Sequence, residues 1–452
     1  MTDKSAENLT WRYPGTFWVA NGIELFERAA YYGMFIALTL YLTREVGFTD
    51  VETGWVVAYF ASTIYLAPTF TGALSDKIGF RNGLMLAFGL LTFGYTLLGA
   101  VPEKLTAILS LTFIMIGGAF VKPIISGTVA KCSDSANRAR AFAIFYQIVN
   151  IGAFLGKTIA KPLRTELGLK YINFYAAGMA LIALILVALF YKNVDTSGVG
   201  KSAREVLNGL LRVVRNLRFM ALILIVAGFW AIQGQLYATM PKYTLRMVGE
   251  AAAPEWLANI NPFIVVLFVV PITHLIRKRT PVTSIAIALF IIPISAFTVS
   301  LSPLIQAVAG NSVSIFGLFS LHPVTVALIV GIALQGLAEC FLSPRFLEFA
   351  SKQAPKGEEG LYMGYQHLTT FFAWLFGFAI SGYLLDAFCP DPATLSETVQ
   401  SQRELALQGL AEMPQVYENA HHIWYVFTGI GLIAFVSLLI YKWITAKIDN
   451  NK

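Results

Sequence analysis

Apolar residues occur in long runs separated by short polar or charged segments. Most of these runs are long enough to cross a bilayer as an α-helix, which needs about 20 apolar residues. They predict twelve membrane-spanning helices, over residues 17–42, 54–74, 83–101, 105–128, 140–161, 171–191, 219–240, 262–277, 282–301, 323–344, 361–385 and 422–443. Many runs contain glycine or proline, which membrane helices tolerate when neighbouring groups satisfy the backbone. The pattern therefore predicts an all-α integral membrane protein.

Composition supports this class. Hydrophobic residues make up 56% of the 452 residues and charged residues 13%, and the mean hydropathy is +0.65. We expect no cleavable signal peptide, because a polar segment precedes the first run and that run is long and charged. The three cysteines, Cys132, Cys340 and Cys389, have no metal or disulfide spacing and are expected to be inert.

The net charge of +7 follows from membrane topology rather than from a nucleic-acid surface. Twelve spans place both termini on one side. That side's tails and loops hold 22 Lys and Arg, and the opposite loops hold 8. Positive residues concentrate on the cytoplasmic side of membrane proteins. We therefore expect a multi-pass protein of the cell (plasma or inner) membrane with cytoplasmic termini, in contact with the lipid bilayer and with no nucleic-acid partner.

A basic segment divides the chain into two halves of six spans, residues 1–191 and 219–452. This linker, residues 192–218, alternates basic with aliphatic residues and resembles an amphipathic helix on an anionic lipid surface. Binding of a partner is the alternative. The polar stretch 386–421 is expected to be an outer loop that is partly helical.

The first span carries three ionisable residues near its middle: Glu24, Glu27 and Arg28. Charges there are costly and persist where they pair or face a water-filled cavity. Arg28 follows Glu24 by one helical turn, so an ion-pair cluster is available. The cluster either locks the helix to its neighbours or forms a proton or substrate site on a transport path, and the second interpretation is favoured.

Two further charges lie inside later spans. Lys122 has no acid nearby in sequence, so it needs a partner from another helix, such as Glu24 or Glu27, or a bound anion. Glu339 is the acid inside a span of the second half, and Ser343 follows it by one turn. Glu339 can exchange a proton near neutral pH or pair with a basic group of the first half.

The loop after the second span, residues 72–81, reads G-x-x-x-D-x-x-G-x-R and resembles the loop motif of major-facilitator transporters. The resemblance implies that Asp76, Lys77 and Arg81 latch helix ends on the cytoplasmic side as a gate. It also implies the major facilitator fold, with two six-helix halves related by pseudo-two-fold symmetry and a site near the midplane.

Six fragments, in order and each on the expected helix, resemble motifs of the proton-dependent oligopeptide transporters. They are residues 24–33 (E-x-x-E-R-x-x-Y-Y-G), 64–68 (I-Y-L-x-P), 117–123 (G-G-x-x-x-K-P), 145–152 (F-Y-x-x-x-N-x-G), 261–262 (N-P) and 339–344 (E-x-x-x-S-P). They cover both halves of the chain.

This resemblance implies roles for individual residues. Glu24, Glu27, Arg28 and Glu339 would couple protons. Arg28 and Lys122 would hold the carboxyl end of a peptide, and Glu339 its amino end. The other residues expected to line the pocket are Tyr32, Phe35, Tyr65, Tyr146, Asn150, Trp230, Gln235, Asn261 and Ser343.

The chain also departs from the family pattern. Phe35 stands where a second arginine is common, and Gly234 stands where an acid is usual. Lys157 is an additional charge in the fifth span. It either replaces part of the lost positive charge or extends toward the outer interface, and we favour the second interpretation. A bulkier or more apolar ligand, packing on Phe35 and Trp230, is equally allowed.

The sequence thus predicts a proton-coupled symporter of di- or tripeptides, or of peptide-like solutes, that works by alternating access. One alternative is a divergent carrier of a bulkier solute, including a proton-antiport exporter, and a remote one is a receptor without transport. The chain is not expected to be an enzyme, because residues 198–202 lack P-loop spacing and no catalytic set shares a membrane depth. We expect a monomer without metal or cofactor, with the proton as coupling ion.

Overall fold

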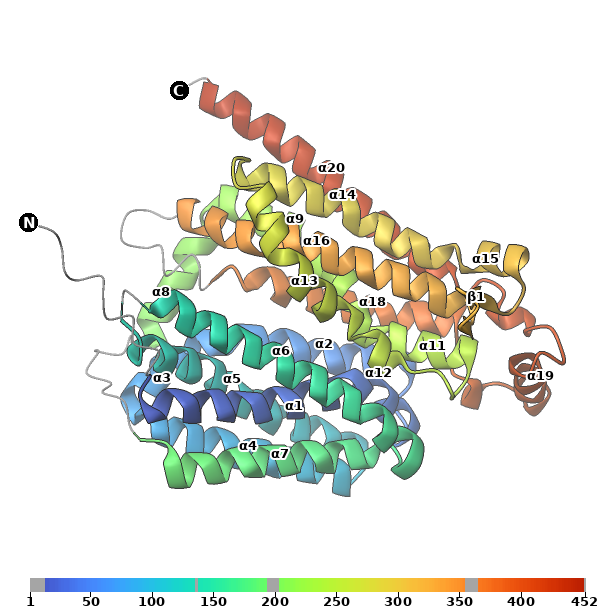
Figure 1. The fold of residues 1–452 in the computed structure, drawn as a ribbon, viewed down its shortest axis with the longest axis horizontal. Coiled ribbons are helices and arrows are strands. Elements are labelled where there is room, and N and C mark those ends of the chain that lie inside the picture. The colour runs from blue at the N-terminus through green and yellow to red at the C-terminus, as the bar shows by residue number, and fades with distance from the viewer. Residues whose placement is uncertain (1–12, 135–136, 193–202, 354–364, 451–452) are drawn as a thin grey trace, which may run out of the picture. The chain divides into compact units, whose positions relative to one another are not determined.

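The computed structural model describes residues 13–134, 137–192, 203–353 and 365–450, and nearly all of its regular structure is helical (Figure 1). The chain forms two compact units. The first contains Met1–Phe35 and Leu66–Leu207, and the second contains Ile36–Tyr65 and Asn208–Lys452. The helix α1 (Gly15–Arg44) contributes to both units.

The first unit is a bundle of long helices. They are α3 (Pro68–Ile78), α4 (Phe80–Ala100), α5 (Lys104–Lys131), α6 (Arg138–Pro162) with the π-helical turn η2 (Leu163–Leu167), and α7 (Lys170–Phe190). Both α5 and α7 pack against α4, and α3 packs against α5. Figure 1 shows α4 and α7 side by side. The amphipathic helix α8 (Ala203–Val214) follows and continues into the second unit.

The second unit contains the remaining helices and one small hairpin. They are α2 (Asp50–Leu66), α9 (Leu217–Gln233), α10 (Gln235–Ala238), α11 (Met240–Val248), α12 (Pro254–Leu257), α13 (Ile260–Leu275), α14 (Pro281–Ser300), α15 (Ser302–Ala309), β1 (Val313–Ile315), β2 (Phe319–Leu321), α16 (Pro323–Gln353), α18 (Leu368–Phe388), η3 (Pro392–Thr394), α19 (Glu397–Leu407), η4 (Gln415–Tyr417) and α20 (His422–Asn450). The helix α14 packs between α16 and α20, and α9 packs against α18 and α20.

The span predictions are confirmed over the described residues, because each predicted run falls largely on helix there; residues 361–364 of the run 361–385 lie outside the described ranges. Ten helices of the described residues are long and apolar enough to cross a membrane. The other two spans are α1, which carries three ionisable residues near its middle, and α2 with α3, which are interrupted at Pro68. Proline lacks an N–H and fits the first turn of a new helix, which explains the break.

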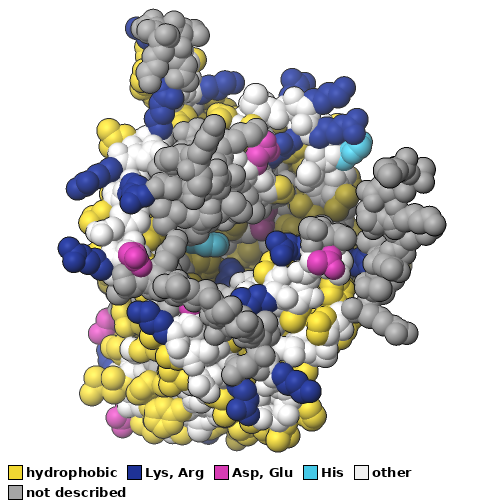
Figure 2. All heavy atoms as spheres, turned by 90° about the vertical axis from the view of Figure 1, so that its left-hand side faces the viewer, with side chains coloured by type: hydrophobic (Ala, Val, Ile, Leu, Met, Phe, Trp, Pro, Cys, Tyr) yellow, Lys and Arg dark blue, Asp and Glu magenta, His cyan; other side chains and the backbone are white. Residues whose placement is uncertain are grey.

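The helical content predicted for the two polar segments is confirmed where the structure describes them, while the lipid surface for the linker and the outer side for 386–421 stay predictions. A helix covers 203–214 of the linker, while residues 193–202 lie outside the described ranges. The stretch 386–421 is partly helical, through η3, α19 and η4. Figure 2 shows many more Lys and Arg than Asp and Glu side chains on the face that it presents, as the unequal charge count along the sequence leads one to expect.

Candidate functional site

The predicted ion-pair cluster on α1 is present. Arg28 Nε lies 3.3 Å from Glu24 Oε1 and forms a second, shorter ion pair with Glu27. Both carboxylates are buried, with Glu24 only 1% exposed. No hydrogen bond within the described part of the chain reaches Glu24 Oε2. Three ionisable groups inside an apolar helix are therefore held by one another, with acceptor capacity left on Glu24.

Two tyrosines extend this cluster along α1. The Arg28 guanidinium lies 5.4 Å from the centre of the Tyr31 ring and 5.9 Å from that of Tyr32, within the range of cation–π attraction. Tyr31 stacks on Phe35 at 5.2 Å between ring centres. Phe35 is completely buried. It is therefore a packing residue in this structure, contrary to the prediction that it lines the pocket.

The helix α6 contacts α1 through glycine. A Cβ at Gly152 would lie 2.7 Å from the Leu25 carbonyl oxygen, and one at Gly156 would collide with the Ala29 carbonyl. Small residues four apart let two membrane helices approach backbone to backbone. Any larger residue at Gly152 or Gly156 would force the two helices apart.

This close approach places Lys157 next to the cluster. Lys157 is 2% exposed, and its Nζ lies 5.7 Å from the centre of the Tyr32 ring. The prediction that Lys157 extends toward the outer interface is therefore wrong. Its ammonium is desolvated within the first unit, on the same tyrosine that Arg28 approaches.

Lys122, on α5, belongs to the same electrostatic group. It interacts with the charges of Glu24, Glu27 and Arg28, so the acid partners expected from α1 are present. Its side chain is exposed although it lies within an apolar span. Tyr95 on α4, which no sequence motif indicated, is buried and interacts with the charges of Glu27 and Arg28.

Tyr146 and Asn150 lie one turn apart on α6, as the sequence predicted. Tyr146 is exposed, and Asn150 is half-buried. The Asn150 side-chain amide donates to the Tyr146 carbonyl oxygen at 2.8 Å. Its amide oxygen is the atom that stays available to a solute.

A second cluster forms around Glu339 on α16. Its Oε2 accepts a hydrogen bond from Gln233 Nε2 at 2.5 Å and one from Asn261 Nδ2 at 3.3 Å. The structure thus joins Glu339 to the predicted Asn261. Sequence reasoning missed Gln233, and the available signal was an amide at the polar end of the apolar run that forms α9.

Gln235 has a different role from the one predicted. It is completely buried, and its amide nitrogen donates to the carbonyl oxygens of Ala231 and Gly377, at 2.8 and 3.3 Å. Its oxygen accepts from the Thr239 hydroxyl at 2.7 Å. Gln235 therefore joins α9 to α18 rather than contacting a solute.

Aromatic rings occupy the neighbouring positions of the second unit. The ring centre of Tyr65 lies 4.8 Å from that of Trp374, and Trp230 is half-buried against Phe229. A Cβ at Gly234 would lie 3.2 Å from Trp374 Nε1. Trp374 thus fills the space into which an acidic side chain at position 234 would project. Ser343 is half-buried, one turn after Glu339.

The predicted gating residues lie around the end of α3. Arg81 Nη2 donates to the Ala188 carbonyl oxygen at 2.8 Å, near the end of α7. A cation at a helix C-terminus satisfies a free carbonyl and the helix dipole. Asp76 is half-buried and Lys77 exposed, and neither forms an ion pair with another described residue. Arg81 therefore joins the start of α4 to the end of α7, while the gating role of Asp76, Lys77 and Arg81 stays a prediction.

A buried ion cluster that the sequence did not reveal lies where α2 begins. Asp50 accepts from Lys242 Nζ at 2.7 Å and from Arg246 at 2.7 and 3.0 Å. Arg246 also contacts Asp391 at 3.1 Å, and Arg403 donates to the carbonyl oxygens of residues 245 and 246. The cluster connects α2, α11 and the segment after α18 within the second unit.

The two cations of this cluster are held with unequal strength, because they share one buried carboxylate. Burial acts against ionisation, but Lys242 and Arg246 together hold the pKa of Asp50 below its usual value. Burial and the neighbouring Arg246 lower the pKa of Lys242 to about 8, although Asp50 opposes them. Burial also acts against Arg246, yet Asp50 raises its pKa further. Arg246 is thus the firm partner and Lys242 the weakly held one.

The described part of the chain is thus a set of membrane-length helices with clusters of ionisable side chains inside its spans, which mark substrate and ion pathways in membrane proteins. The chain belongs to the Major Facilitator Superfamily, whose sequence model matches residues 22–317. Proteins of this superfamily are transporters rather than enzymes.

Curated relatives of two kinds resemble the chain. Multidrug resistance protein MdtH of Photorhabdus laumondii is 22% identical over 357 residues, covering 79% of this chain and 83% of the relative. Dipeptide and tripeptide permease A of Klebsiella pneumoniae is 23% identical over 434 residues, covering 81% and 84%.

The fold also matches solved structures. A crystal structure of the peptide transporter POT in complex with sulfate superposes with a TM-score of 0.74 at 19% identity, covering 96% of this chain and 95% of that one. The predicted major facilitator fold with twelve membrane-spanning helices is confirmed.

Proposed function

We infer that this protein is a divergent member of the proton-dependent oligopeptide transporters, which carries a short peptide or a peptide-like solute together with protons across the cell membrane. The observation that carries the proposal is the cluster of Glu24, Glu27, Arg28 and Lys122 in the first unit. The peptide permease among the relatives and the fold shared with peptide transporters support it.

The first unit favours an anionic group. Arg28, Lys122 and Lys157 carry three positive charges, against two negative charges on Glu24 and Glu27. A solute carboxylate would balance the excess, as the carboxyl end of a peptide would. Lys157 supplies a charge near Tyr32 that compensates for the arginine absent at position 35.

The second unit favours a hydrogen-bond donor. Glu339 accepts hydrogen bonds from Gln233 and Asn261, and an ionised carboxylate accepts hydrogen bonds and donates none. An amino group of the solute would donate to this carboxylate, and protonation of Glu339 would release that group. Both termini lie in the cytoplasm and the protein works as a monomer in this proposal.

A second candidate function is export of a bulkier, more apolar solute by proton antiport. The specific observations in its favour are Trp374 in the space beside Gly234, and the multidrug resistance relative. This candidate function uses the same proton-binding carboxylates and differs from the first in the direction of transport and in the size of the solute.

The test is uptake of labelled dialanine into proteoliposomes, with and without an inside-alkaline pH gradient. We expect gradient-stimulated uptake that is lost in Glu27→Gln and in Lys122→Ala. Glu45→Gln and Lys104→Ala are matched controls, because both remove the same side chain from an exposed position.

The opposite outcome is also informative. Folded protein that takes up no dialanine or trialanine contradicts peptide symport. Proton-driven movement of a fluorescent apolar cation in the other direction, abolished by Glu27→Gln, then supports the exporter.

A further inference from the structure

The segment between α14 and α16, residues 301–322, is not explained by transport. It contains the helix α15, the hairpin of β1 and β2, and the turns between them. It has no Asp, Glu, Lys or Arg, and His322 at its end is its one titratable side chain. A loop of this length in water ordinarily carries charge, so its composition is that of a membrane-contacting segment.

Its large apolar side chains are exposed rather than packed. Phe316 is 95% exposed, Val308 83% and Leu318 80%. Leu304 and Phe319 are exposed as well. Soluble surfaces rarely gather apolar side chains in this way, and such gatherings mark contact with a partner or a membrane.

The hairpin has one apolar and one polar face. In its register Val313 pairs with Leu321 and Ile315 with Phe319, while Ser314 pairs with Ser320. Side chains directly opposite in a hairpin share a face, and successive residues alternate between faces. The four apolar residues therefore lie on one face and the two serines on the other.

The turn of the hairpin holds Phe316 in a strained backbone conformation with its ring exposed. The Leu318 N–H donates to the Ile315 carbonyl at 3.0 Å, and both residues between them have positive φ, 52° at Phe316 and 70° at Gly317. Primed turns of this kind favour Asn, Asp or Gly at both central positions. In the described part of the chain, Phe316 is the one non-glycine residue with positive φ. Since its ring has almost no protein contact, packing does not account for it.

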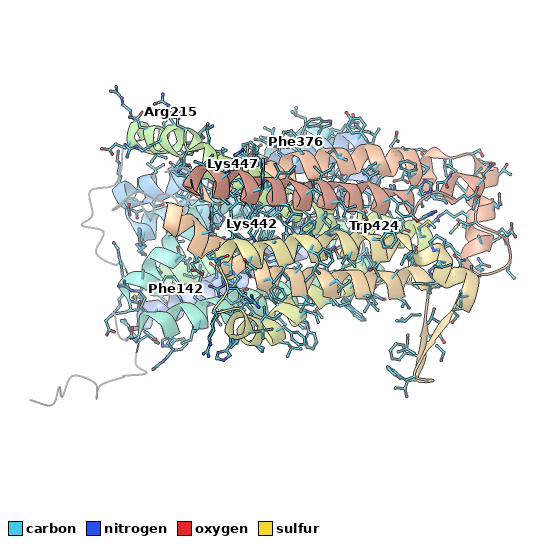
Figure 3. All side chains as sticks on the ribbon, turned by 90° about the horizontal axis from the view of Figure 1, so that it is seen from above. Phe142, Arg215, Phe376, Trp424, Lys442 and Lys447 are labelled. Carbon is cyan, nitrogen blue, oxygen red and sulfur yellow. The ribbon has the colours of Figure 1, made fainter. Side chains whose placement is uncertain are left out.

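The direction of the hairpin fits the membrane surface. Figure 3 shows it projecting sideways from the bundle, across the direction of α14 and α16 and near their ends. Exposed apolar residues also continue into it from the preceding span, through Phe290, Ile294 and Phe297 of α14 and then Leu304 and Val308 of α15. A structure at the end of two spans that runs across their axes lies in the plane of the bilayer surface.

We propose that residues 301–322 form an interfacial anchor, in which Phe316, Leu318 and the apolar hairpin face insert between the lipids of the outer leaflet. The lipid surface is the occupant because the segment offers no charge to a protein partner and follows directly from a lipid-facing helix. It binds the headgroup–acyl boundary by apolar insertion, without a requirement for anionic lipid.

Spin-label accessibility in lipid nanodiscs tests the anchor. Labels are attached at Phe316→Cys and Leu318→Cys in a Cys132→Ser background, since Cys340 and Cys389 are buried. Ser396→Cys, exposed before α19, is the matched water-facing control. We expect labels at 316 and 318 to collide with oxygen several-fold more than with a water-soluble nickel complex, and the label at 396 to show the reverse. The result should be equal in phosphatidylcholine with and without phosphatidylglycerol.

Three outcomes overturn the proposal. A label at 316 as accessible to nickel as the one at 396 places the tip in water. A label protected from both reagents places it against protein, for example a second copy of this chain. Lipid contact that requires phosphatidylglycerol would mean that charge holds the segment at the membrane, which contradicts binding by apolar insertion.

A stability measurement separates anchoring from packing. Asn adopts positive φ more readily than Phe, so Phe316→Asn should keep or raise the thermal stability in detergent. A loss of stability there means that Phe316 holds protein contacts, which contradicts the proposal. In nanodiscs, a label at 318 should lose oxygen contact when Phe316→Asn is added.

Discussion

The buried ion cluster of the second unit gives the most quantitative prediction, through the variant Asp50→Asn. Asp50 is the shared partner of Lys242 and Arg246, and all three side chains are almost completely buried. Removing one partner of a buried ion pair costs about 3–5 kcal/mol, because the other charge stays buried without compensation. Arg246 keeps its contact with the more exposed Asp391, whereas Lys242 keeps no ion pair among the described residues.

Deprotonation of Lys242 limits the cost. An ordinary lysine has a pKa of about 10.4, so neutralising Lys242 at pH 7 costs about 5 kcal/mol, at about 1.4 kcal/mol per unit. A loss near 3–5 kcal/mol at pH 7 is therefore expected. At about 2 °C per kcal/mol, the lower end of the range for larger proteins, the melting temperature falls by about 6–10 °C.

The pH dependence provides a sharper signature. The folded pKa of Lys242, about 8, is below that of the unfolded chain. Between those two values the unfolded state binds more protons, so wild-type stability rises with pH above about 8 and is flat below it as far as Lys242 is concerned. Without Asp50 the pKa of Lys242 falls further, so the stability of the variant begins to rise at a lower pH than that of the wild type. The loss of stability caused by Asp50→Asn should therefore shrink as the pH increases toward 8, by up to about 1.4 kcal/mol per pH unit. Above pH 8 the loss should stay constant.

The assay is unfolding of detergent-purified protein, followed by tryptophan fluorescence at pH 6, 7, 8 and 9. The double variant Asp50→Asn with Lys242→Met should recover most of the stability and lose the pH dependence, since replacing a whole buried pair is nearly neutral. Asp391→Asn is the control and should cost about 1 kcal/mol, because that side chain is 22% exposed. A loss in Asp50→Asn that is equal at pH 6 and pH 8, or that Lys242→Met does not reduce, would refute the reasoning.

Three further predictions concern the cluster around Arg28 and the cluster around Glu339. Gly156→Ala should lower stability by about 1–3 kcal/mol by overpacking the α1–α6 contact, whereas Gly178→Ala, with open space around its Cβ, should be neutral in the same thermal assay. Gln233→Leu removes a hydrogen bond to the Glu339 carboxylate, worth about 1.5–3 kcal/mol, and should shift the pH profile of transport while folding is retained; an unchanged profile contradicts the role of Gln233. Lys157→Met should reduce the affinity for solutes with a carboxylate more than for their amides, as measured by competition in the uptake assay, and equal losses for both contradict the charge argument.

The sequence predicted the spans well, because an apolar run of bilayer length has few alternatives to a helix. It also predicted the pairing of Glu24 and Arg28, since residues four apart on a helix are neighbours. It did not predict α15 and the hairpin. The predicted spans 282–301 and 323–344 left residues 302–322 as a connection, and its short apolar stretches gave no period that identifies a helix followed by a hairpin.

Contacts between distant segments were harder to predict. Gln233 and Gln235 are two positions apart in the same apolar run, yet one binds Glu339 and the other joins two helices. The turn between α9 and α10 at Gly234 decides which of them faces which neighbour. Asp50 and Arg246 each looked like an ordinary loop charge, because no local rule connects residues so far apart in sequence.

In the proposed function, Lys157 compensates for a departure from the family pattern. The family resemblance places a cation on α1 at position 35, but this chain has a buried phenylalanine there and a cation on α6 instead. The exchange depends on Gly156, because only backbone contact between the helices brings the Lys157 ammonium to Tyr32. On this proposal the site would keep the positive charge of the family's second arginine at a different position.

In the proposed function, this arrangement would also link proton binding to solute binding. When Glu24 or Glu27 takes up a proton, Arg28 loses one of its two counter-charges and the net charge of the cluster rises by one. An anionic group then binds more tightly, and by reciprocity a bound anion raises the proton affinity of the carboxylates by the same free energy. A solute that carries a cation would oppose protonation here and would be released by it. The sign of this coupling thus connects an anionic cargo with proton symport and a cationic cargo with proton antiport, so one charge count separates the two candidate functions.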